Sequence, residues 1–168
     1  MISYATNIGL SIRLRSPRHV IVTSDEMLRT HGILLRRCQQ VALAIFTQEA
    51  AEYEFSPTQY SALAFIHIEP GIHQNTLGER IALDRSSVTK CVEGIENRGL
   101  IRREVDRRDK RARLLYITPL GEEMLENVTA ASARARGRIK DVIGEDGYIK
   151  FIGALQAFSS LLDEEATP

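Results

Sequence analysis

The sequence predicts a mainly α-helical protein with one small β-hairpin, and three observations support that prediction. Apolar residues recur at steps of three and four along most of the chain, which is the period of an amphipathic helix. The pairs Ser56-Pro57 and Thr118-Pro119 each combine a capping hydroxyl with a proline suited to the first helical turn. Residues 100–118 hold two short runs rich in Ile, Leu, Val and Tyr around a charged segment, which indicates two strands and a turn.

Composition narrows the function classes only slightly. The chain has 168 residues, of which 43% are hydrophobic and 26% are charged, as in an ordinary globular domain. Its 22 Lys and Arg residues balance 22 Asp and Glu residues, so the net charge identifies no partner. Cys38 and Cys91 are too few for a disulfide framework or a zinc site, and no run approaches the ~18 apolar residues of a membrane helix. We therefore expect a cytoplasmic protein without membrane contact.

The N-terminal part of the chain divides at residue 24. Residues 1–23 lack the uninterrupted apolar core of a leader peptide, because arginines break it, and we expect a poorly ordered or loosely docked arm. A start codon assigned too early is the alternative. Ser24, followed by two acids, predicts the start of one long helix that extends to about Glu54. The apolar face of this helix is wider than one small neighbour would cover.

The centre of the chain predicts three helices in close succession. The first begins at a capping box, Ser56–Gln59, and stops at Pro70-Gly71. A short helix over residues 74–82 follows it. A third helix, over residues 85–98, ends at Gly99, which supplies the left-handed residue of a helix end.

Two strands and two more helices complete the prediction. The strands "LIRREV" and "ARLLYIT" are joined by "DRRDKR", residues 106–111. A helix then runs from Thr118-Pro119 to about Ile143, and a last amphipathic helix follows Gly144. The order helix, short helix, turn, helix and hairpin is that of a winged helix-turn-helix.

Basic residues gather in this central module. Residues 85–113 contain ten Lys or Arg and five Asp or Glu. Their net charge is therefore +5, in a chain whose total charge is zero. A DNA duplex, with one phosphate charge per ~1.7 Å, is the partner that such a footprint suits. The third helix would present hydroxyls and cations to the major groove, and the hairpin tip would present cations to the minor groove. The helix residues are Arg85, Ser86, Ser87, Thr89 and Lys90, and the tip residues are Arg107, Arg108, Lys110 and Arg111.

Two other interpretations stay open at this point. The hairpin could be a solvated loop in which Asp106 and Asp109 neutralise their arginine neighbours. A winged-helix module could also bind only protein. A steep loss of duplex affinity with rising salt separates DNA binding from both alternatives.

Residues 56–125 resemble the MarR (multiple antibiotic resistance regulator) family, most specifically in "LDRSSVTKCVEGIENRGLI" and "DRRDKRARLLYITPLG". The resemblance implies a homodimeric transcriptional regulator, most often a repressor, that reads a palindromic operator in double-stranded DNA. It also implies that Ser86, Ser87, Thr89 and Lys90 face the groove, that Arg111 enters the minor groove, and that Asp109 holds the wing tip. The chain departs from the family at His73, where a Ser or Thr cap is usual, and at Gly78, where Ala is common. These departures weaken the short helix by ~1 kcal/mol.

The resemblance implies a division into three working parts. Residues 24–55 would form an N-terminal dimerisation helix, residues 56–118 the DNA-binding module and residues 119–168 the C-terminal dimerisation helices. The apolar faces at both ends of the chain favour a dimer independently, because symmetric pairing would cover them. Packing of these helices on each other within one chain is the alternative.

A small aromatic or anionic effector that lowers DNA affinity is a further implication of the resemblance. It would bind between the dimerisation helices and the winged module, and the candidate contacts are Arg36, Arg37, Phe46, Tyr60 and His67. Each of these residues could instead be an ordinary surface or packing residue. Cys38 is the candidate for a redox switch, with an inert buried thiol as the alternative.

Nothing in the sequence indicates an enzyme. The four histidines form no metal-ligand spacing with each other or with the cysteines, and no nucleophile elbow or phosphate loop is present. We therefore expect no catalytic residue, no metal and no cofactor.

Overall fold

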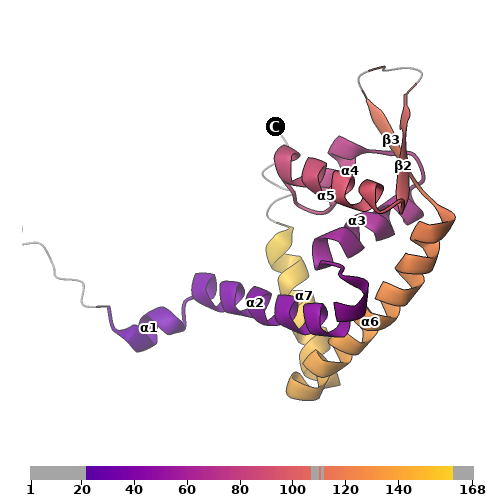
Figure 1. Ribbon diagram of the computed structural model, residues 1–168. Helices are drawn as coiled ribbons and strands as arrows, with labels where there is room; N and C mark the ends of the chain where they lie inside the picture. The colour runs from indigo at the N-terminus through magenta and orange to yellow at the C-terminus, as the bar shows by residue number, and fades with distance from the viewer. Residues whose placement is uncertain (1–21, 107–109, 111, 161–168) are drawn as a thin grey trace, which may run out of the picture. The chain divides into compact units, whose positions relative to one another are not determined.

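The computed structural model describes residues 22–106, 110 and 112–160, and it confirms the predicted fold class (Figure 1). Helices form most of the chain, and one small antiparallel sheet lies at the winged module. The helices are α1 (Ser24–Leu28), α2 (His31–Glu49), a 3-10 turn (Ala51–Tyr53), α3 (Pro57–Ile68), α4 (Gln74–Arg80), α5 (Arg85–Asn97), α6 (Pro119–Ile143) and α7 (Glu145–Ser159). The strands are β1 (Ile72–His73), β2 (Ile101–Val105) and β3 (Arg113–Ile117).

The chain divides into two compact units, residues 1–36 and residues 37–168. In the first unit, the predicted single helix from Ser24 to Glu54 is wrong in three respects. Its cap is Thr23, whose hydroxyl accepts from the Glu26 amide while the Glu26 carboxylate accepts from the Thr23 amide. The helix breaks before His31, where the Thr30 hydroxyl donates to the Met27 carbonyl at 2.8 Å and satisfies a helix-end acceptor. The second segment then ends at Glu49.

The predicted helices of the central module are confirmed with small shifts at their ends. Ser56 and Gln59 form the reciprocal capping box at the start of α3. His73 gives α4 no side-chain cap, as its residue type implied. Gly99 adopts a φ of 72° and ends the turn after α5.

The sheet has a third strand that the sequence did not predict. Its order is β1-β3-β2, and all neighbours are antiparallel. Ile72 and His73 pair with Leu115 and Leu114, so β1 consists of two residues. Because two residues cannot show an alternating pattern, this strand left no signal in the sequence.

One apolar core joins α3, α4, α5, the sheet and α6. The inner stripe of α5, Val88, Val92 and Ile95, is at most 1% exposed. It packs in the same cluster as Leu63, Ile66, Leu77, Leu115 and Val128. Each fully buried side chain of this size contributes about 1.5–3 kcal/mol, so this stripe fixes the orientation of α5 on the body.

The start of α6 lies against the chain that leads into the wing. The Thr118 hydroxyl donates to the Gly99 carbonyl at 2.7 Å and accepts from the Gly121 amide at 3.1 Å. A Cβ atom on Gly121 would overlap the Leu100 carbonyl oxygen and lie 2.7 Å from the Ile117 Cγ1 atom. Only glycine therefore permits this approach.

An ion pair holds the wing to α5. Arg103 on β2 donates to the Glu96 carboxylate on α5, with its Nε atom at 2.7 Å from Oε2. The Arg103 guanidinium lowers the pKa of Glu96 by hydrogen bonding to the charged carboxylate. Both side chains are about three-quarters buried, so solvent screens this pair less than a surface pair.

Replacing Gly121 with alanine should destabilise the fold by about 2–3 kcal/mol, because the added methyl group meets a backbone carbonyl that cannot move aside. The measurement is urea unfolding followed by circular dichroism. Gly94→Ala on α5 is the control: its Cβ would meet only the Gln59 amide nitrogen at 3.4 Å, and alanine gains up to ~1 kcal/mol of helix propensity. Equal stability of the two variants would contradict the close approach at Gly121.

Replacing Glu96 with glutamine should cost about 1 kcal/mol near neutral pH, and this cost should vanish in acid. Arg103 holds the pKa of Glu96 below its ordinary value of 4.5 in the folded protein. The stabilisation is therefore complete above pH 4.5 and is lost as the pH falls through the lower folded pKa. Urea unfolding of both proteins at a series of pH values measures the difference.

Glu104→Gln provides the matched control for that series. Glu104 pairs with Arg102 on the same strand, but both of these side chains are about half exposed. Its loss should change stability little at any pH. A Glu96 effect that stays constant down to pH 3 would rule out an electrostatic origin.

Candidate nucleic-acid interface

The first turn of α5 is organised by the carboxylate of Asp84. Its Oδ1 atom accepts from the backbone amides of Ser86 and Ser87, both at 2.9 Å, which caps the helix. The hydroxyls of the same two serines also donate to this carboxylate, Ser86 to Oδ1 at 2.8 Å and Ser87 to Oδ2 at 2.7 Å. These bonds, led by that of the Ser87 hydroxyl, hold the pKa of Asp84 well below its usual range.

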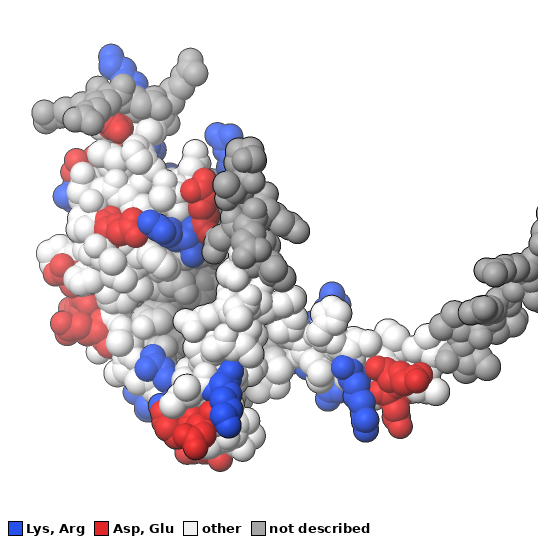
Figure 2. All heavy atoms as spheres, turned by 180° about the vertical axis from the view of Figure 1, so that it is seen from behind, with Lys and Arg blue, Asp and Glu red and all other residues white. Residues whose placement is uncertain are grey.

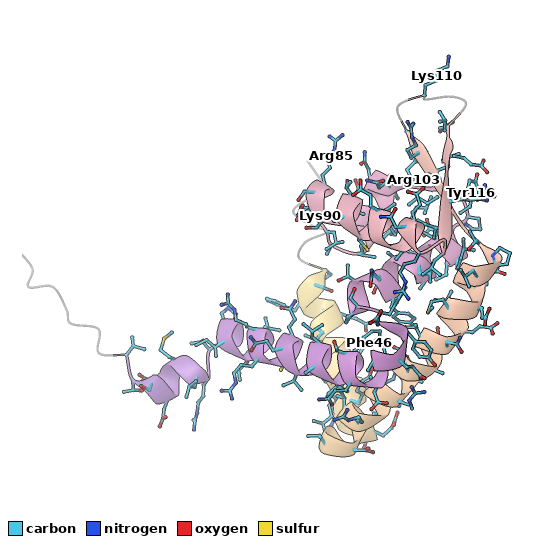
Figure 3. All side chains as sticks on the ribbon, viewed as in Figure 1. Phe46, Arg85, Lys90, Arg103, Lys110 and Tyr116 are labelled. Atoms are coloured by element: carbon cyan, nitrogen blue, oxygen red, sulfur yellow. The ribbon has the colours of Figure 1, made fainter. Side chains whose placement is uncertain are left out.

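Long cations extend from the same end of the module. Arg85 and Lys90 are exposed on α5, and neither forms a salt bridge with a described residue. Figure 3 shows Arg85 and Lys110 pointing away from the body in the same direction, one from the start of α5 and the other from the hairpin. Cations placed in this way can contact the phosphates on one side of a duplex.

A polar hollow of about 420 Å³ lies between α4, α5 and the hairpin. In its wall, Gln74 of α4 donates to the Thr89 hydroxyl at 2.9 Å, and that hydroxyl donates to the Arg85 carbonyl at 2.8 Å. Thr89 thus uses its hydroxyl proton internally and braces α5 against α4. The hollow is lined by His73, Gln74, Asn75, Thr76, Arg85, Thr89, Ala112 and Arg113.

Within the described part of the wing, acids neutralise the arginines of β2. Arg102 pairs with Glu104 and also stacks over the Tyr116 ring, 4.5 Å from its centroid. Arg103 pairs with Glu96. Arg113 instead donates to the carbonyls of Lys110 and Ala112, which leaves its charge without a carboxylate partner among the described residues. The predicted wing residues Arg107, Arg108, Asp109 and Arg111 lie outside the described residues.

The first half of α6, which begins at the base of the wing, carries several acidic side chains (Figure 1). Figure 2, seen from behind, shows acidic side chains gathered along the edge that α6 forms. Glu122, Glu123 and Glu126, in the first half of that helix, are all exposed. A duplex is repelled from this edge, so the charge distribution favours docking at α5 and the hairpin.

The structure does not gather the five predicted effector contacts in one hollow. Phe46 is 7% exposed, and its ring packs against Tyr60 with centroids 5.8 Å apart, so both residues belong to the core cluster or its edge. His67 lies 4.0 Å from Glu122 at the surface. Arg37 lines a separate apolar hollow, and Arg36 belongs to the first unit. Aromatic residue types alone did not distinguish the wall of a pocket from a packed core.

The two cysteines lie in different surroundings. Cys38 is exposed and lines the same hollow as Arg37, a space of about 320 Å³ between α2, α6 and α7. The sequence analysis gave an inert buried thiol as the alternative to a redox switch at Cys38. That alternative is wrong for the single chain, because Cys38 is exposed. Cys91 packs against the core, and burial raises the pKa of its thiol.

Two residues of the interface escaped the sequence prediction. Asp84 had a signal, because an Asp directly before a helix is a strong cap. Gln74 had no such signal, since its contact with Thr89 joins two helices.

Among the described residues, no group of three or more His, Cys, Asp or Glu is placed to hold a metal ion. No described helix is both long enough and apolar enough to cross a membrane.

Comparisons of the sequence and of the fold with known proteins point to the same family. The model of the MarR family matches residues 53–112. The transcriptional regulator HosA of Escherichia coli is 34% identical over 86 residues, which are 48% of this chain and 64% of HosA. The alignment thus spans slightly less than two thirds of this curated relative.

Solved structures match more of the chain. The PcaV transcriptional regulator from Streptomyces coelicolor, in complex with its natural ligand, is 30% identical with a TM-score of 0.76, and the match covers 83% of this chain and 98% of PcaV. The repressor CouR bound to a 23-mer DNA duplex has the same fold, with a TM-score of 0.77 at 23% identity, and the match covers 83% of this chain and 99% of CouR. The helix order, the winged module and these matches together place the chain in the MarR family of transcriptional regulators.

Proposed function

We propose that the protein is a homodimeric repressor that binds a palindromic operator through α5 and the wing. The observation that carries this proposal is a set of exposed cations on α5 and the hairpin, Arg85, Lys90 and Lys110, none of which forms a salt bridge with a described residue (Figure 3). Phosphate contacts of this kind supply affinity, while Ser86, Ser87 and Thr89 lie where base edges would be read. The hairpin residues Arg107, Arg108, Asp109 and Arg111 complete the proposed contact by the family pattern.

The same proposal assigns work to the rest of the chain. Residues 24–55 and 119–168 supply the dimer interface, and residues 56–118 form the DNA-binding module. Exposed apolar side chains on α2, α6 and α7 support this division, because a stable monomer seldom leaves so many uncovered. They are Val41, Leu43, Val142, Ile143, Ile149 and Phe158. Two modules about 34 Å apart would then meet successive turns of a duplex. A cytoplasmic location is part of the proposal.

An effector that lowers DNA affinity completes the proposal, and the PcaV regulator, solved with its natural ligand, supports it. The apolar hollow that Arg37 and Arg138 border is the site that we propose for an aromatic carboxylic acid. A rise in melting temperature with such acids, together with weaker operator binding, is the measurement that tests it.

Replacing Lys90 with alanine should weaken specific and non-specific duplexes by similar factors and should reduce the slope of log K against log[salt] by about 1, because one phosphate contact is lost. Fluorescence anisotropy with a labelled duplex over a range of salt concentrations measures both. Lys150→Ala is the control, since Lys150 is exposed on α7 outside the module. Loss confined to the specific duplex would assign Lys90 to a base; no loss would remove it from the interface.

Replacing Val41 with aspartate should convert the dimer into a monomer of 18.9 kDa, because the new charge replaces an exposed apolar side chain that the proposed interface covers. Light scattering measures the mass, and operator affinity should fall with it. Ile68→Asp, at an exposed apolar position at the end of α3, should leave the mass unchanged. A wild-type protein that is monomeric would contradict the proposed assembly.

A further inference from the structure

The two serines at the start of α5 differ from ordinary surface hydroxyls in one respect. A free hydroxyl rotates, so it can either donate to a base or accept from one. In this structure both hydroxyl protons are directed at the Asp84 carboxylate, at 2.8 Å for Ser86 and 2.7 Å for Ser87. What remains on each oxygen for a DNA partner is lone-pair electrons alone.

Turning either serine hydroxyl away from Asp84 would break a strong hydrogen bond. A charged acceptor makes each bond stronger than one between neutral groups, and the Oδ1 atom is also held in place by two backbone amides. Asp84 has no proton of its own to offer, because the same bonds keep it ionised. The direction of the Ser86 and Ser87 hydroxyls is therefore set by Asp84 before any duplex arrives.

We infer that Asp84 is a specificity-determining residue, which makes Ser86 and Ser87 obligate hydrogen-bond acceptors toward the bases of the operator. This inference rests on the proposed DNA-binding function. In the major groove, acceptors pair with the amino groups of adenine and cytosine and are repelled by the oxygens of guanine and thymine. The structure thus assigns these two positions to amino-bearing bases.

Thr89 follows the same logic through different partners. Its hydroxyl donates to the Arg85 carbonyl and accepts from the Gln74 amide. The methyl group is the part of Thr89 that has no hydrogen-bonding task. This side chain is therefore suited to apolar contact, such as that with the methyl group of thymine.

Replacing Asp84 with asparagine offers a test that keeps the cap. The two backbone amides require an oxygen at the Oδ1 position, so the asparagine NH₂ group must take the place of Oδ2, opposite the Ser87 hydroxyl. That NH₂ group donates to Ser87, and the Ser87 proton becomes free to donate to a base. The Ser86 hydroxyl still donates to Oδ1. Asp84→Asn therefore reverses the hydrogen-bonding role of Ser87 alone, and asparagine caps a helix about as well as aspartate.

The experiment selects duplexes from a randomised library with the wild-type dimer and three variants, followed by sequencing. Ser87→Ala should reduce base discrimination about fivefold to tenfold at one position of each half-site. Asp84→Asn should invert the preference at that same position, toward bases with an oxygen acceptor. Glu79→Gln is the charge control: it removes a carboxylate beside the same end of α5, in a hollow that Arg85 also lines, and should select the wild-type sequence.

A second measurement uses the wild-type protein alone. A base that lacks the amino group replaces the selected base, purine for adenine or pyrimidin-2-one for cytosine, and should weaken binding by the same factor. The inference is overturned if Asp84→Asn selects the wild-type sequence, if Ser87→Ala changes no position, or if the duplex without the amino group binds normally. Failure of the wild-type protein to enrich any sequence would instead refute the proposed function, and the inference with it.

Discussion

Burial of one stripe of α5 is the constraint on which the interface depends. Val88, Val92 and Ile95 are enclosed by α3, α4 and the sheet, and a helix is rigid, so fixing this stripe also fixes the opposite face. Arg85 and Lys90 are exposed as a consequence of core packing, and neither forms a salt bridge with a described residue. Core and binding surface are therefore two sides of the same helix, and a change in the first is felt in the second.

The charge that faces outward is smaller than the local sum suggests. The sequence count of +5 between Arg85 and Arg113 includes Arg102 and Arg103, which pair with glutamates at the base of the wing. Glu96 thus joins β2 to α5 through Arg103, and Glu104 pairs with Arg102 within β2. The cations left for phosphates are those at the start of α5 and toward the tip of the hairpin, where a duplex would pass between them.

The sequence predicted this architecture wherever a signal was local and repeated. The periodic stripe of α5, the capping box at Ser56 and the cap at Thr118 all appear as expected. It missed β1, which is too short to have a pattern, and the break before His31, where the Thr30 hydroxyl donates to the Met27 carbonyl. For the candidate site, residue types predicted a hydroxyl face, which stays a prediction, and the cap signal of Asp84 did not reveal that its carboxylate also sets the direction of the Ser86 and Ser87 protons. The candidate effector contacts do not share one hollow in this structure, and two of them, Phe46 and Tyr60, pack in the core or at its edge.

The course of α6 gives the proposed effector a physical route to the DNA. The helix has 25 residues and is therefore about 37 Å long, and its first turn is stitched to the wing by Thr118 and Gly121. In its second half, Arg134 and Arg138 form salt bridges with the carboxylate of Glu49 on α2, and Arg138 also lines the apolar hollow. One continuous helix therefore joins the base of the wing to the surroundings of the apolar hollow. In the proposed dimer, a ligand that shifted α6 in the hollow would move the base of the wing, and two wings that no longer matched successive turns of the duplex would lose affinity together.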